Sequence, residues 1–228
     1  MRRVEAVRRL SPGDPGWPAG LQRLGAEAPV GLEVVGAEQL MLKPALGLFC
    51  SQRAPGRIIV ESYDVARALA SSGEVVVGGF HSPMERELLS YLLQGSASVI
   101  ICPARRSTPT AVPRSWRRAL GAGRLLIVSP FPPGTIRPTS ATAELRNRFA
   151  AALSARLLIL HATVGGRLAR LARECASWKI PVHCLDHPAN EDLRLLGATP
   201  LAGFTRHPEW AAAVDRASES RPTQPILQ

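Results

Sequence analysis

Short, almost continuous apolar runs recur along the chain from residue 45 onward, and amphipathic segments separate them. Each run has the length of a strand and is bounded by Gly, Pro or Ser, a pattern typical of strands that a parallel sheet buries on both faces. The runs cover residues 45–50, 74–80, 97–102, 124–131, 156–162 and 181–187. We expect each of them to form a strand.

The intervening segments have apolar residues at helical spacing and predict helices over 57–71, 83–94, 142–154 and 166–178. The first stops at Gly73, and the second begins at Pro83 after Ser82, a good N-cap. Strand and helix alternate about six times. The sequence therefore predicts an α/β protein: a doubly wound, mostly parallel Rossmann-like sheet of about six or seven strands with helices on both faces.

The two ends of the chain have a different character. Residues 1–40 are turn-rich and predict a lead-in packed on the main domain, which spans residues 41–205. Residues 206–228 contain one plausible helix followed by a polar tail. The basic, irregular stretches 104–113 and 130–142 are long for loops of an α/β domain, and such loops are often functional.

The net charge of +10 favours anionic partners, nucleic acid above all. Only Lys43 and Lys179 are lysines, so the positive charge is almost all arginine, and a compositional bias explains part of it. The placement of single arginines is therefore more informative than the total. No apolar run approaches the roughly 18 residues of a membrane span, so we expect no membrane partner and a cytoplasmic location.

The cysteines and histidines do not form a ligand pattern. The four cysteines are scattered without CxxC spacing, and the five histidines are equally dispersed. Apolar surroundings favour buried, reduced thiols over disulfides or zinc ligands. We expect no metal and no cofactor.

Candidate ligand contacts follow the predicted strands, because open parallel sheets bind ligands beyond the carboxyl ends of their strands. Ser51 and Arg53 follow the first strand and could hold a phosphate. Gly78 and Gly79 end the second strand, where glycine is unfavourable unless the backbone needs it. Ser82 caps the following helix.

Two further clusters complete the candidate phosphate site. Arg146, Asn147 and Arg148 enter an apolar helix; the two arginines, two residues apart, point in different directions, so one can face the sheet crevice while the other pairs elsewhere. Gly165 and Gly166 form a strand-to-helix turn suited to cradling phosphate.

These segments together resemble the DprA/Smf family of DNA-processing proteins, which is related to the LOG phosphoribohydrolases. The resemblance rests on the proline-rich lead at 14–21, the segment Ser-Gln-Arg at 51–53, the turn at 78–85 and, most specifically, the sequence RNRFAAALS at 146–154. It implies binding of single-stranded DNA in a basic pocket and, in typical members, loading of a recombinase onto that DNA.

The favoured function is therefore a DprA-like single-stranded DNA-binding protein, with a small-nucleotide sensor or a LOG-like nucleotide hydrolase as alternatives. Catalysis is the weaker hypothesis, because no nucleophile–base couple appears. Exposed sheet edges make a homodimer reasonable. A further basic surface could extend the DNA site, with Trp116 more suited to packing than to base stacking; its arginines are Arg105, Arg106, Arg114, Arg117 and Arg118.

Overall fold

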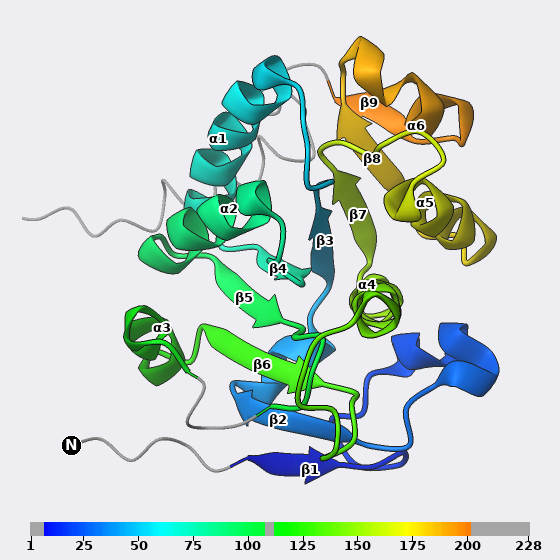
Figure 1. Cartoon of the computed structure of the whole chain (residues 1–228). Coiled ribbons are helices and arrows are strands. Elements are labelled where there is room, and N and C mark those ends of the chain that lie inside the picture. The colour runs from blue at the N-terminus through cyan, green and yellow to red at the C-terminus, as the bar shows by residue number, and fades with distance from the viewer. Residues whose placement is uncertain (1–6, 108–111, 202–228) are drawn as a thin grey trace, which may run out of the picture.

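The fold is built on a single mixed sheet, seen in a computed structural model that describes residues 7–107 and 112–201. In these ranges nine strands are arranged in the order β1-β2-β6-β5-β4-β3-β7-β8-β9 (Figure 1). β2 pairs antiparallel with β6 and β1 antiparallel with β2, whereas every other pair is parallel. The predicted α/β class with a mostly parallel Rossmann-like sheet is confirmed.

The six apolar runs predicted as strands all form strands. Alternate side chains of each enter one of two separate cores: in the first, Leu46 and Leu48 face one core and Phe49 the other. Burial on both faces explains why the runs are nearly continuous in apolar residues. The strands are β3 (Ala45–Phe49), β4 (Val75–Gly78), β5 (Ser98–Ile101), β6 (Leu125–Ser129), β7 (Arg156–Ile159) and β8 (Val182–Leu185).

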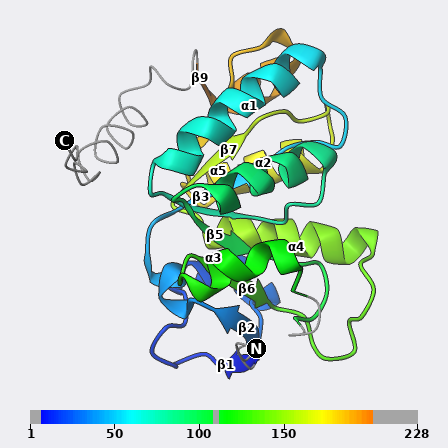
Figure 2. The same ribbon diagram turned by 90° about the vertical axis from the view of Figure 1, so that its left-hand side faces the viewer.

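Helices cover both faces of the sheet, as expected (Figure 2). On one face lie α1 (Gly56–Ser71), α2 (Pro83–Gln94) and α3 (Arg117–Gly121). The other face carries α4 (Ser140–Ala152), α5 (Arg167–Ser177) and α6 (Glu191–Leu195). Short 3-10 helices join them: η1 (Ala19–Glu27), η2 (Glu38–Leu42), η4 (Arg114–Trp116) and η5 (Pro188–Asn190).

The turn-rich lead-in contributes two strands that the sequence did not predict, β1 (Arg8–Leu10) and β2 (Leu32–Gly36). β2 escapes the pattern because Glu33 interrupts its apolar residues. Glu33 is nevertheless buried, and its carboxylate accepts a hydrogen bond from the Ser107 amide at 3.1 Å. The lead-in thus continues the sheet beyond β6, and the predicted boundary near residue 40 falls inside η2.

At the other edge, β9 (Thr199–Leu201) pairs parallel with β8. The helix and tail predicted over 206–228 lie outside the described residues. No helix in the described ranges is long and apolar enough to cross a membrane. The four cysteines are free and buried, as expected from the apolar stretches around them.

Candidate phosphate-binding site

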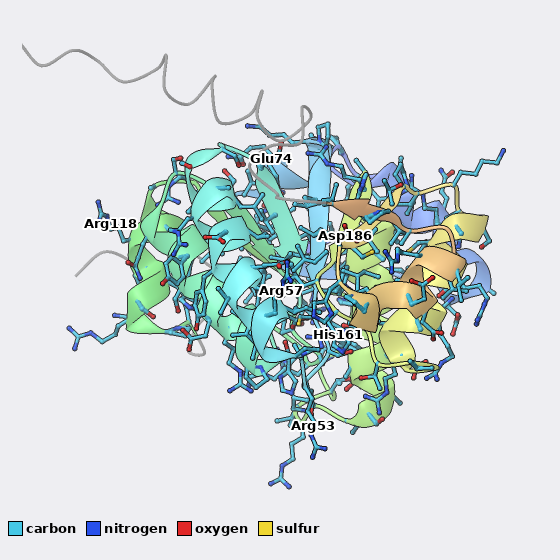
Figure 3. The ribbon with its side chains drawn as sticks, turned by 90° about the horizontal axis from the view of Figure 1, so that it is seen from above. Arg53, Arg57, Glu74, Arg118, His161 and Asp186 are labelled. Carbon is cyan, nitrogen blue, oxygen red and sulfur yellow. The ribbon has the colours of Figure 1, made fainter. Side chains whose placement is uncertain are left out.

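A cleft of about 710 Å³ opens at the carboxyl edge of the sheet. From β3, successive strands are added toward β6 on one side and toward β9 on the other, so the strand order reverses between the neighbours β3 and β7. Doubly wound sheets bind ligands at such a switch point. Figure 3 shows Arg53, beyond β3, at the opposite end of the sheet from Glu74, which precedes β4. The lining comes from the loops after β3, β5 and β7, the turn after β4, the first two turns of α4 and the start of α5.

The loops after β3 and β7 are tied to each other. The Ser51 hydroxyl accepts a hydrogen bond from the Thr163 amide at 3.0 Å, and the Ser51 amide donates to the His161 carbonyl at 2.9 Å. Gly166 then begins α5 without any side-chain cap. The amides of the first turn of α5 therefore have no intrahelical acceptor and suit an anion at this end of the cleft.

Arg146 lies at the floor of the cleft, with only 5% of its surface exposed. Its Nε donates to Asn147 Oδ1 at 2.8 Å and its Nη1 to the Cys102 carbonyl at 3.4 Å. Among the described residues, Nη2 has no hydrogen-bond partner. Burial lowers the pKa of Arg146, and the charge of nearby Glu85 opposes this shift. Because an arginine stays protonated in proteins, the site holds a desolvated cation with free donors.

Two glycines beneath the cleft allow this arrangement. A Cβ on Gly79 would lie 2.0 Å from Arg146 Nη1, so glycine is required for the guanidinium to occupy its position. A Cβ on Gly78 would lie 2.9 Å from the Leu48 carbonyl oxygen of the neighbouring strand. The pair therefore serves close packing around Arg146, which explains the glycines that the sequence singled out.

The turn after β4 is organised by Glu85. Ser82 and Glu85 form a capping box at the start of α2, as the sequence suggested for Ser82. Glu85 also accepts hydrogen bonds from the amides of Cys50 at 2.9 Å and His81 at 2.8 Å. Phe80, between the glycines and this cap, has a φ of 47°, an unfavourable value for a bulky residue. Glu85 thus joins the end of β3 to a strained turn.

Of the ten predicted phosphate contacts, six line this cleft: Ser51, Arg53, Ser82, Arg146, Asn147 and Gly166. Gly78 and Gly79 do not line it but pack beneath it. Gly165, next to Gly166 in the sequence, has a φ of 62°, and its amide donates to Asp192 Oδ2 at 3.3 Å instead of facing the cleft lining. Arg148 does not line the cleft either.

Arg148 is bound by carboxylates on the far side of α4. Its Nη2 lies 2.6 Å from Glu174 Oε1, and its Nη1 pairs with Glu27. These hydrogen bonds, the one to Glu174 first, raise the pKa of Arg148. The sequence had indicated that Arg146 and Arg148 point in different directions, and the structure confirms it.

The further basic surface lies outside the cleft, because none of its five arginines is among the lining residues. Arg106 forms an ion pair with Glu33, in which its Nη2 lies 3.7 Å from Glu33 Oε1, whereas Arg105 is exposed. Arg114, Arg117 and Arg118 are exposed on η4 and α3. Trp116 is half-buried against the core under α1–α3, consistent with packing.

Sequence reasoning missed Arg167, Thr139 and Ser140, which also line the cleft. Arg167 Nη2 donates to the Ser140 hydroxyl and so joins the first turns of α4 and α5. A signal was present: Arg167 directly follows the glycine pair, and Thr139 with Thr142 forms a capping box. Among the described residues, no three His, Cys, Asp or Glu side chains gather in a way that could hold a metal.

Together, the doubly wound sheet and the arginine-lined cleft at its switch point define a Rossmann-like protein with a cleft at the position where such sheets bind ligands. The family model for DNA recombination-mediator protein A matches residues 8–198. The chain therefore belongs to the DNA recombination-mediator protein A (DprA) family, as the resemblance of its motifs had suggested.

Two solved structures share this fold. DNA processing protein A from Streptococcus pneumoniae is 17% identical, with a TM-score of 0.71 over 87% of this chain and 72% of that one. DNA processing protein A from Helicobacter pylori, described with a single-stranded DNA binding mode, is 19% identical, with a TM-score of 0.70 over 94% of this chain and 97% of that one. A comparison with curated protein sequences finds no significant match.

Proposed function

We propose that this protein binds single-stranded DNA through backbone phosphates at the carboxyl-edge cleft, in a role in DNA processing or recombination. The observation that carries the proposal is the buried guanidinium of Arg146, which presents unpartnered donors to the cleft. Membership of the DprA family and the single-stranded DNA binding described for the H. pylori protein support DNA as the source of the phosphates.

The phosphate contacts fall to side chains and amides that already face the cleft. Arg146 and Arg167 supply charge, Arg53 projects from the rim, and the Ser51 hydroxyl and the amides of the first turn of α5 supply neutral donors. The side-chain oxygen of Asn147, Oδ1, accepts a hydrogen bond from Arg146 Nε, which leaves the side-chain NH2 group of Asn147 as a further donor. Arg105, Arg106, Arg114, Arg117 and Arg118 would extend the surface for longer strands.

The same contacts favour binding over catalysis. Glu85 is the one carboxylate that lines the cleft in the described ranges. It accepts hydrogen bonds from three backbone amides, those of Cys50, His81 and Ser82, so it is poorly placed to act as a general base. His161 is buried and its Nδ1 lies 3.0 Å from Asn190 Oδ1. We therefore propose a binding protein rather than a phosphoribohydrolase.

The size of the cleft supports a second candidate, a small-nucleotide sensor. A volume of about 710 Å³ lies in the range of small-molecule sites, roughly 300–1,000 Å³. A sensor and a DNA-binding protein would differ in how affinity depends on chain length and salt, because each further phosphate contact adds counterion release.

The test is fluorescence anisotropy with labelled oligothymidylates of increasing length at low and moderate salt. The proposal predicts affinity that rises with length, falls with salt and is strongly reduced by Arg146→Ala. Arg67→Ala is the matched control, because Arg67 is exposed on α1 and pairs only with Asp64. Length-independent binding of a mononucleotide would favour the sensor, and no binding of oligonucleotides at low salt would overturn the DNA proposal.

A recombinase partner, a homodimer and a cytoplasmic location belong to the same proposal. Membership of the DNA recombination-mediator protein A family supports a recombinase as a partner of this protein on DNA. Light scattering after size-exclusion chromatography tests the dimer, and a single peak of monomer mass at all protein concentrations would contradict it.

A further inference from the structure

The charge of the cleft matches a doubly charged ligand. Among the described residues, its lining contains three arginines, Arg53, Arg146 and Arg167, and one carboxylate, Glu85, which together give a net charge of two positive. An internal phosphodiester of DNA carries one negative charge. A terminal phosphomonoester carries about −1.5 to −2 near neutral pH.

The burial of Arg146 also favours a terminal phosphate over an internal one. With 5% of its surface exposed, the guanidinium contacts only a group that enters the cleft fully. An internal phosphate brings a nucleoside on each side, whereas a terminal phosphate enters first with one chain behind it. The planar fork of Arg146 and the open first turn of α5 together offer more donors than the two free oxygens of a diester need.

The lining also lacks what a strand running through the cleft would use. Proteins that track single strands stack successive bases on aromatic side chains. Within the part of the chain that the structure describes, no Phe, Tyr or Trp lines this cleft. Recognition there therefore depends on phosphate rather than on a row of bases.

We infer that the cleft is a terminal-phosphate site, which seats the phosphomonoester at an end of a DNA strand on Arg146 while the rest of the strand leaves toward Arg53. This inference rests on the proposed DNA-binding function and deepens it. Its ligand chemistry is a phosphomonoester, which a 5′-phosphate, a 3′-phosphate or a free mononucleotide could supply.

The experiment compares one oligothymidylate carrying a 5′-phosphate, a 3′-phosphate or hydroxyls at both ends, each with an internal label, and adds dTMP and thymidine as competitors. We expect one phosphorylated end to raise affinity about tenfold, the scale of a few charge-assisted hydrogen bonds. Arg146→Lys keeps the charge but removes the planar fork, so it should abolish this preference. Arg67→Lys on α1 is the control and should keep it, and circular dichroism verifies the fold of both variants.

The outcomes separate this inference from the proposed function. Equal affinity for all three ends, reduced equally by Arg146→Lys, would overturn the terminal-phosphate site and leave single-stranded DNA binding in place. Binding of dTMP but not thymidine, without oligonucleotide binding, would support the phosphomonoester site and overturn the DNA proposal. Failure of every phosphate ligand to bind would overturn both.

Discussion

Gly79 and Arg146 meet at the floor of the cleft so closely that a side chain on one excludes the other. A Cβ at position 79 would lie 2.0 Å from Arg146 Nη1 and 2.1 Å from its Cζ, well inside van der Waals contact. The glycine that follows β4 and the arginine of α4 are 67 positions apart in sequence, yet together they decide whether a guanidinium can sit in the cleft.

Gly79→Ala should therefore displace Arg146 rather than disturb the strand itself. We expect single-stranded DNA affinity to fall at least about tenfold, and the free energy of unfolding to fall by about 1–3 kcal/mol from overpacking. Anisotropy and urea unfolding measure the two effects. Gly134→Ala is the control, since a Cβ there meets nothing within 4 Å. Unchanged affinity in Gly79→Ala would show that Arg146 does not need this position.

Glu85→Ala tests the carboxylate that joins β3 to the turn after β4. Removing it leaves the buried amides of Cys50 and Ser82 and the partly buried amide of His81 without their acceptor, so we expect a loss of unfolding free energy of roughly 3 kcal/mol. Urea unfolding checks this against Glu87→Ala, an exposed position on the same helix. Equal, small losses in both variants would mean that the amides find other acceptors.

Glu144 pairs with two arginines at the start of α5, so we expect it to compete with a phosphate ligand for them. Its carboxylate lies 3.4 Å from Arg170 and 3.9 Å from Arg167, and all three side chains are well exposed. Glu144→Gln should free both cations and raise DNA affinity about two- to fourfold. Glu191→Gln removes the same charge from α6, where Glu191 pairs with Arg194. If the DNA affinity of both variants rises equally, the rise reflects the change in net charge alone.

The interior of the sheet and the loops of the cleft could be predicted from the sequence because each obeys a local rule. The run at 45–50 is apolar because β3 is buried on both faces, and Ser82 before Pro83 marks the start of α2. Ser51 and Gly166 follow strands whose carboxyl ends must share an edge. Such rules act within a few residues, so one sequence displays them.

The remaining features depend on partners distant in sequence. β2 contains a glutamate, Glu33, whose burial is compensated by partners distant in sequence, the Ser107 amide 74 positions away and the guanidinium of Arg106. Arg146 and Arg148 look alike in sequence, and only the carboxylates of Glu174 and Glu27 separate their roles. The reason for Gly79 is likewise a single side chain of another helix. No local pattern carries that information.

The buried thiols predict a dependence of stability on alkaline pH. Burial raises the pKa of Cys50, Cys102 and Cys175 to about 12, and that of Cys184 to about 11, from an ordinary 9.0. Unfolded thiols ionise first, so the stability that these groups contribute is complete below about pH 9 and is lost as the pH rises toward 12. Native protein at pH 8.5 should resist iodoacetamide until urea unfolds it, as mass spectrometry can show. Rapid native labelling of Cys50, which borders the cleft, would contradict this.

Arg148 provides the sharpest separation between a phosphate ligand and a structural ion pair. Its side chain is 22% exposed and bound by Glu174 and Glu27, so Arg148→Ala should lower the free energy of unfolding by about 1–3 kcal/mol while DNA affinity changes less than about twofold. Glu174→Gln weakens the same pair from its other side and should reproduce the loss of stability with no loss of affinity. Urea unfolding and anisotropy measure both quantities on both variants. A loss of affinity in Arg148→Ala as large as that of Arg146→Ala, with Glu174→Gln binding normally, would instead place Arg148 among the phosphate ligands, as its position beside Asn147 first suggested.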